Sequence, residues 1–99
     1  MPEVTKHAAK RIKQRLGLPM RGAEKTARLA MEKGLRHGDT TGYLRRYMDA
    51  LYLRHRVADN VRIWNGNAYL FAGDVLITVF PLPPRMRKEA EKQIKRRGQ

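Results

Sequence analysis

The feature that most constrains the fold is residues 61–81, VRIWNGNAYLFAGDVLITVFP, where β-branched and aromatic residues are divided by two turn signals. Asn65-Gly66 fits a two-residue type I′ turn, because both central positions of that turn need a positive φ. Gly73-Asp74 is a second signal for a tight turn. The stretch therefore predicts a three-stranded antiparallel meander over residues 61–64, 67–72 and 75–80.

Two-residue loops also fix a register, which sorts the side chains between the two faces of the sheet. One face is predicted to be aliphatic and to pack against helices. The other is predicted to be mixed, with a cross-strand row of Arg62, Tyr69 and Thr78. A slip of one residue at either turn would move a strand's side chains to the opposite face and dissolve this row.

Three helices are predicted ahead of the meander, over about residues 5–16, 20–33 and 41–56. Thr5 can cap the first helix, and Gly17 can end it in the left-handed conformation. The predicted fold class is α+β, with three N-terminal helices on one face of a C-terminal three-stranded sheet. We expect a single domain at residues 1–84, followed by a basic tail at 85–99 that is either helical or disordered.

Charge is the second strong feature, since 22 Lys and Arg stand against 9 Asp and Glu in 99 residues, a formal net charge of +13. Residues 85–99 hold seven basic and two acidic residues, which leaves 15 basic and seven acidic residues in the rest. The body is therefore basic in its own right. This excess favours nucleic acid as the partner, then an acidic protein, then anionic lipid.

Other features narrow the protein class. No run approaches the roughly 18 apolar residues of a membrane span, and the N-terminus lacks the apolar core of a secretory signal. The absence of cysteine excludes disulfides and thiolate metal sites. We therefore expect a cytoplasmic protein with no membrane association, no cofactor and no metal.

The opening helix carries the candidate chemistry. His7, Arg11 and Arg15 recur every fourth residue, which places an imidazole and two guanidiniums on neighbouring turns of one face. Histidine moves protons near neutral pH, and arginine stabilises a crowded phosphorane. Paired carboxylates and metal-ligand spacings are missing from the sequence. The set suits phosphodiester cleavage in RNA, where the 2′-OH supplies the nucleophile.

The motif His7-Ala8-x-x-Arg11-x-x-x-Arg15, with Leu76-Ile77-Thr78-Val79-Phe80 in the last strand, resembles the small toxins of the barnase–EndoU–colicin–RelE superfamily. The colicin-like and BrnT-like branches are the most similar. The resemblance implies a metal-independent endoribonuclease, often paired with an antitoxin or carried on a mobile element. It implies catalytic roles for His7, Arg11 and Thr78. The chain departs from the family pattern in the additional helix at 41–56 and in having only three clear strands.

Further contacts to nucleic acid are predicted from charge, position and register. These residues are Arg15, His37, Arg45, Arg46, Arg62, Tyr69, Arg85 and Arg87. Trp64 and Phe71 have rings that could stack on bases, but aromatic sheet residues are more often core, and we favour core for both. His55 is expected to sit at the end of the third helix, where a positive ring suits the helix dipole.

Two hypotheses follow. The first is an endoribonuclease that leaves a 2′,3′-cyclic phosphate. The second is a non-catalytic phage or mobile-element protein that binds nucleic acid or a nucleoprotein, such as an inhibitor of a host defence complex. The sequence leaves open whether the protein is an enzyme. RNA is the expected partner, an acidic antitoxin or a host nucleoprotein the alternative, and the oligomeric state is not predicted.

Overall fold

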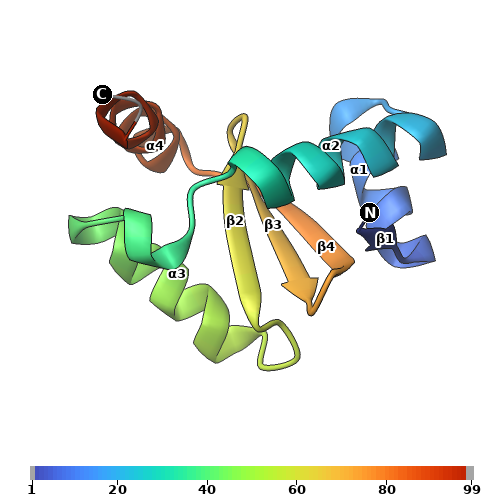
Figure 1. Cartoon of the computed structure of the whole chain (residues 1–99), viewed down its shortest axis with the longest axis horizontal. Helices are drawn as coiled ribbons and strands as arrows, with labels where there is room; N and C mark the ends of the chain where they lie inside the picture. The colour runs from blue at the N-terminus through green and yellow to red at the C-terminus, as the bar shows by residue number, and fades with distance from the viewer. Residues whose placement is uncertain (1, 98–99) are drawn as a thin grey trace.

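A four-stranded mixed sheet lies at the centre of the molecule in the computed structural model, which describes residues 2–97 (Figure 1). The strand order is β1-β4-β3-β2, with β1 parallel to β4 and the other neighbours antiparallel. The elements are β1 (Glu3–Val4), α1 (Lys6–Leu16), α2 (Met20–Lys33), the 3-10 helix η1 (His37–Asp39), α3 (Gly42–Arg54), β2 (Asn60–Trp64), β3 (Asn67–Ala72), β4 (Val75–Pro81) and α4 (Pro84–Arg97).

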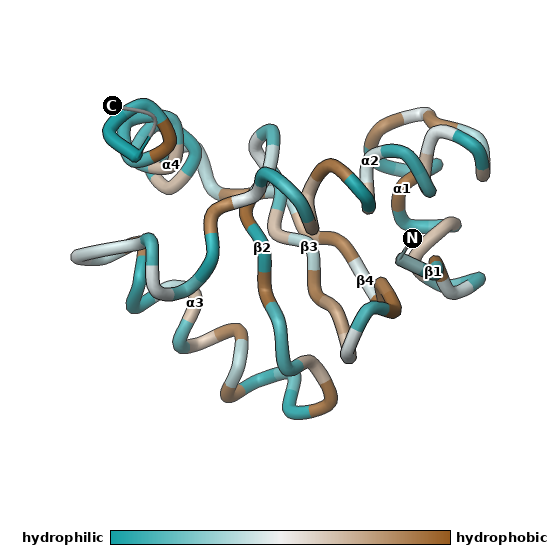
Figure 2. Tube along the Cα trace, viewed as in Figure 1, coloured by the Kyte–Doolittle hydropathy of each residue, from teal (hydrophilic) through white to brown (hydrophobic). Residues whose placement is uncertain are grey.

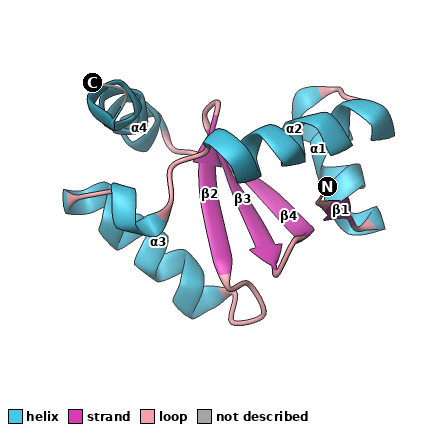
Figure 3. Cartoon of the chain, viewed as in Figure 1, coloured by secondary structure: helices cyan, strands magenta, loops and turns pink. Residues whose placement is uncertain are grey.

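The α+β class and the β2–β3–β4 meander are confirmed, but the predicted arrangement around them is wrong in two respects. The sheet has a fourth strand, β1, whose two residues pair in parallel with Val75 and Leu76. The helices also cover both faces of the sheet rather than one: α1 and α2 lie on one side, and α3 and α4 on the other (Figures 1 and 3).

The second helical layer exists because the face predicted to be mixed is too apolar to meet water. Tyr69, Phe71 and Leu76 on that face are fully buried. They pack beneath α1 and α2, and α2 contributes only small side chains there, Ala23, Ala27 and Ala30. Small residues let a helix approach a sheet that carries large aromatic side chains. The opposite face packs Val61, Ile63, Ala68 and Leu70 against Leu44, Met48 and Leu51 of α3.

The predicted register holds in one hairpin and fails in the other. Asn65 and Gly66 both have positive φ, 50° and 82°, and Arg62 pairs with Tyr69 as predicted. In the second hairpin the pairing starts as predicted and then shifts at a β-bulge, so Tyr69 lies opposite Val79. Thr78 lies opposite Leu70 instead. The predicted row of Arg62, Tyr69 and Thr78 is therefore wrong, because one extra residue in β4 moves Thr78 to the other face.

Helix α1 begins and ends where the sequence predicts. The backbone N–H of Ala8 donates to Thr5 Oγ1 at 3.1 Å, and Gly17 closes the helix with φ 69°. Ala8 and Ile12 are its buried residues and face the sheet. His7 and Arg11 each precede one of these positions, so they lie beside the buried stripe rather than under it.

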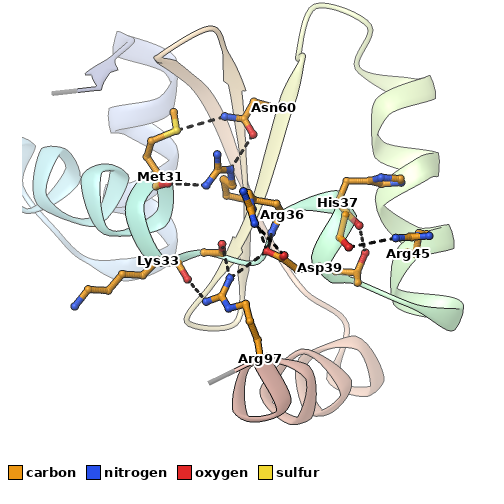
Figure 4. A network of polar contacts seen from close by, with 12 residues as sticks. Met31, Lys33, Arg36, His37, Asp39, Arg45, Asn60 and Arg97 are labelled. Atoms are coloured by element: carbon orange, nitrogen blue, oxygen red, sulfur yellow. Dashed lines mark hydrogen bonds and ion pairs between the residues drawn. The ribbon is translucent and has the colours of Figure 1, made fainter. Parts of the chain in front are cut away.

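Helix α4 (Pro84–Arg97) contains residues 85–97 of the predicted tail, while residues 98–99 lie outside the described part of the chain. Figure 2 shows α4 as a mainly hydrophilic helix, and polar contacts help to hold it against the rest of the fold. The side chain of Gln93 accepts from the backbone N–H of Thr41 at 3.1 Å. Arg97 donates to the carbonyl oxygens of Lys33 and Gly34 (Figure 4).

No helix formed by residues 2–97 has the length and apolar character needed to cross a bilayer.

Candidate functional site

A hollow of about 470 Å³ opens beside the part of β4 that β1 does not cover, and we call it the edge hollow. Its wall combines side chains from α1, from the chain at the end of α3, and from β4. The residues are His7, Arg11, Arg54, His55, Arg56, Val57, Ile77, Thr78 and Phe80. The three residues predicted to be catalytic, from opposite ends of the sequence, thus meet in one place.

The α1 side supplies an imidazole and a guanidinium. His7 is exposed and Arg11 is half-buried, and both line the edge hollow. The i, i+4 spacing keeps them on adjacent turns, about 6 Å apart along the helix axis. Because Ala8 and Ile12 fix α1 against the sheet, the rotation of the helix is set and these polar groups face the opening.

The α3 side supplies a second imidazole between two arginines. The backbone N–H of His55 donates to the carbonyl of Leu51 at 2.8 Å, so the residue caps the end of α3. Its ring lies against Phe80, with the centroids 5.1 Å apart. Phe80 thereby restricts the orientation of the His55 imidazole, while Arg54 and Arg56 on either side remain exposed.

The β-bulge in β4 places Thr78 in this site. In a regular ladder Thr78 would face Tyr69 beneath α1 and α2. The inserted residue turns it toward the face that also carries Phe80, and both Ile77 and Thr78 reach the wall of the edge hollow. Thr78 is only 7% exposed, so it contributes a largely buried residue to this wall. Bulges commonly re-aim a side chain beside a functional site.

The edge hollow is strongly positive. Three arginines line it and no acidic residue does. Among residues 2–97, no ion pair involves Arg11, Arg54 or Arg56. Guanidiniums gathered without carboxylates repel one another, and an anion that fits among them relieves that repulsion. The geometry therefore suits a phosphate or another small anionic group flanked by two imidazoles.

The other predicted contact residues divide into two groups. Arg15 and Arg87 line further hollows along the same side of the molecule. Arg46 and Arg85 are exposed, and the Arg85 guanidinium lies 5.3 Å from the centre of the Tyr43 ring. The edge hollow contains none of these four side chains.

The remaining predicted residues are engaged within the fold. Tyr69 is fully buried, with its hydroxyl 2.8 Å from Thr26 Oγ1, and burial raises its pKa. Arg62 donates to the carbonyl oxygen of Met31 and to the side chain of Asn60. The His37 ring contacts Asp49. The Arg45 guanidinium donates to the carbonyl oxygen of Gly38. These four side chains lie away from the edge hollow.

Sequence reasoning did not assign the second imidazole to the site. His55 was interpreted only as a helix-terminal residue, which it is, and its 48-residue separation from His7 gave no sign that the two would share a wall. Only the chain path from α3 into β2 and the pairing of β4 bring them together. The Arg-His-Arg run at 54–56 was the one available signal, since it concentrates charge at a helix end.

In the described range of 2–97, no three His, Cys, Asp or Glu side chains gather closely enough to hold a metal ion. Comparison with protein-family models, with curated proteins and with solved structures finds no match to this chain.

Proposed function

We propose that this protein is an endoribonuclease that cleaves RNA at the edge hollow without a metal ion. The observation that carries the proposal is the convergence of two imidazoles, three guanidiniums and a hydroxyl on a hollow of about 470 Å³. Two imidazoles can serve as the paired acid and base of a phosphoryl transfer, and the arginines match the charge of the phosphate. The similarity of the α1 motif to small ribonuclease toxins gives the same expectation.

The proposed reaction is an internal transesterification. One imidazole, of His7 or His55, removes the proton from the ribose 2′-OH as the oxygen attacks the adjacent phosphorus. The bond from phosphorus to the 5′-oxygen of the next nucleotide breaks, and the other imidazole donates a proton to that oxygen. The products are a 2′,3′-cyclic phosphate and a 5′-hydroxyl.

The arginines and Thr78 stabilise the negative charge of the phosphorane. The non-bridging oxygens of the phosphate are contacted from two sides: by Arg11 on α1, and by Arg54 and Arg56 at the C-terminal end of α3. The Thr78 hydroxyl is a neutral donor in the wall of the edge hollow. Such preorganised donors contribute the largest share of stabilisation in many enzymes, because they need no reorientation as charge develops.

The test is incubation of the purified protein with total RNA and transfer RNA in EDTA. We expect cleavage by the natural protein, loss of about 10²-fold or more in His7→Gln and Arg11→Ala, and little change in Lys13→Ala. Lys13 is a matched control, because it is an exposed basic residue of α1 outside the edge hollow.

The product and the substrate give independent checks of the mechanism. Mass spectrometry distinguishes a cyclic from a linear terminal phosphate by the mass of one water. An oligonucleotide with a single 2′-deoxy sugar at the cleaved position should resist cleavage, because it lacks the nucleophile. RNA that stays intact with natural protein and variants alike would reject the enzymatic proposal.

The alternative function, a non-catalytic binder of a nucleoprotein, is favoured by one observation. Leu53 and Val57 are 74% and 77% exposed, and both lie beside the arginines at the end of α3. Apolar side chains that protrude next to a positive surface fit a protein partner better than a phosphate backbone. This function predicts salt-dependent binding with no cleavage, and loss of affinity in a Leu53→Ser, Val57→Ser double variant.

A further inference from the structure

Two more hollows continue the edge hollow along the molecule. The middle hollow, of about 430 Å³, shares Arg54, His55 and Phe80 with the edge hollow. The hairpin hollow, of about 640 Å³, shares Arg15 and Pro81 with the middle hollow. Because each hollow has wall residues in common with the next, the three lie in a row from His7 to the β2–β3 turn, and we call this row the groove.

The groove follows an edge of the sheet. Strand β1 pairs only with Val75 and Leu76, so the remainder of β4 has no strand neighbour on that side among residues 2–97. Thr78, Phe80 and Pro81 line successive hollows along this edge. Helix α1 borders one side of the groove. The other side is formed by α3 and its C-terminal end in the edge and middle hollows, and by α4 in the hairpin hollow, so the walls belong to the two helical layers.

One side of the groove is a line of positive groups. His7, Arg11 and Arg15 follow α1, and the distance from the first to the last along the helix axis is about 12 Å. At the far end Arg87 and Lys95 of α4 line the hairpin hollow, where Glu91 is the acidic residue in the wall. The positive line therefore extends beyond the edge hollow in one direction.

The hairpin hollow differs from the others in having an indole in its wall. Trp64 lies at the end of β2, directly before the Asn65-Gly66 turn, and is half-buried. Its inner side packs against the core beneath α1 and α2, while it also lines the hollow. Packing of this kind holds a ring in one orientation, as a platform for a flat ligand requires.

We infer that the groove binds a single strand of RNA, with one base stacked on Trp64 and the phosphates following the α1 line to the edge hollow. The inference rests on the proposed function for the identity of the polymer. A single strand is required, since paired bases do not expose their faces for stacking. Base stacking tolerates any sequence, so Trp64 would add affinity without selecting a particular base.

The single tryptophan of the chain provides a direct test, because all indole fluorescence comes from Trp64. We propose titration with a 2′-O-methyl RNA strand of about ten nucleotides, which spans the groove and cannot be cleaved. Stacking should quench the fluorescence as the strand binds. The same sequence in a closed hairpin duplex should bind more weakly and leave the fluorescence nearly unchanged.

Variants at Trp64 separate stacking from packing. Trp64→Leu should weaken binding of a fluorescently labelled strand by about tenfold, measured by anisotropy, while Trp64→Phe should retain most of the affinity. Both variants keep an apolar side chain against the core, and thermal unfolding checks that each is folded. Arg87→Ala and Lys95→Ala should each reduce affinity several-fold, and Lys13→Ala should not.

The outcomes distinguish this inference from the proposed function. Strand binding that leaves the Trp64 fluorescence unchanged, or equal affinity for the duplex, would overturn the groove even if RNA is cleaved. Quenching without cleavage of ordinary RNA would support the groove and reject the nuclease. If Trp64→Leu is unfolded, the quenching titration on the natural protein and the affinity of Trp64→Phe still decide the result.

Discussion

The molecule holds two groups of arginines in opposite surroundings. Arg36, Arg62 and Arg97, which we call the network arginines, donate hydrogen bonds to oxygen atoms of the protein itself. Figure 4 shows Arg36 and Arg97 converging on Asp39. Arg11, Arg54 and Arg56, which we call the hollow arginines, line the edge hollow and take part in no ion pair within residues 2–97. The two groups carry equal charge, and only the second presents it to solvent without a partner.

Two of the network arginines, Arg62 and Arg97, join segments that are distant in sequence. Arg97 of α4 lies 3.2 Å from Asp39, and Asp39 also accepts a hydrogen bond from Arg36. The Arg97 guanidinium also donates to the carbonyl oxygens of Lys33 and Gly34 at the end of α2. Arg62 of β2 donates to the carbonyl of Met31 at 2.6 Å. Helix carbonyls carry partial negative charge at this end, so the guanidiniums both cap α2 and tie it to β2 and α4.

Net charge alone therefore does not locate an anion site. A formal charge of +13 includes arginines that stabilise the fold and arginines that are left to meet a ligand. Substitution in the two groups should therefore have separate consequences: loss of stability for the network arginines, and loss of RNA cleavage or binding for the residues of the groove.

The largest expected effect is on cleavage, from His55→Gln in the edge hollow. Removal of one partner of an acid–base pair should lower the cleavage rate by about 10²- to 10⁴-fold. The amide keeps a polar side chain of similar length against Phe80, so the urea midpoint should change little. Rates on a labelled RNA and urea unfolding monitored by Trp64 fluorescence give the two values. A variant that cleaves at the natural rate would remove His55 from the mechanism.

The next effect is on stability, from Arg62→Met in the network. The variant keeps the aliphatic stem but removes the donors to the Met31 carbonyl and, at 2.9 Å, to Asn60 Oδ1. Loss of charged hydrogen bonds to a helix end should lower the free energy of unfolding by about 2 kcal/mol. Urea unfolding measures the change, with Arg21→Ala on the exposed side of α2 as the control. Unchanged stability with lost RNA affinity would mean that Arg62 contacts RNA and does not stabilise the fold.

A smaller effect concerns acid stability. Hydrogen bonds from Arg36, assisted by Arg97, lower the pKa of Asp39 to about 2. An unfolded aspartate titrates near 3.9, so Asp39 contributes stability above that pH and loses it as the pH falls toward 2. Asp39→Asn should reduce the free energy of unfolding by about 1 kcal/mol at neutral pH and by much less near pH 2.

The measurement for Asp39 is a pair of urea titrations, at neutral and at acidic pH, for both proteins. The two stability curves should converge on acidification. A constant difference between them would mean that the carboxylate charge is not what holds Arg36 and Arg97 in place.

The hairpin turns show how far sequence determines this fold. Asn65-Gly66 and Gly73-Asp74 predict both turns correctly, because the required positive φ values restrict the choice of residues. The caps Thr5 and Gly17 are predicted for the same reason. These are local rules, in which a few neighbouring residues decide the conformation.

The bulge in β4 and the position of α4 depend on contacts that no local rule contains. Ile77 and Thr78 carry no turn signal, so no local pattern indicates the extra residue in β4. α4 offers only Ala90 and Gln93 as buried residues, and its place depends on partners at Thr41, Asp39 and the end of α2. The same holds for the candidate site. Helical spacing predicts that His7 and Arg11 lie together, whereas the position of His55 depends on the path of the chain from α3 into β2.

The smallest effect, and the most direct comparison of the two groups, is the salt dependence of RNA binding. Arg15→Ala in the groove should remove one phosphate contact and reduce the slope of log affinity against log salt by about 0.7 for a single strand. Arg36→Ala in the network should leave the slope unchanged, because its guanidinium is already paired with Asp39 at 3.2 Å. Anisotropy titrations of a labelled 2′-O-methyl strand at several salt concentrations measure both slopes. Equal slopes for the two variants would mean that arginines bound to protein oxygens contact RNA as readily as those that line the groove.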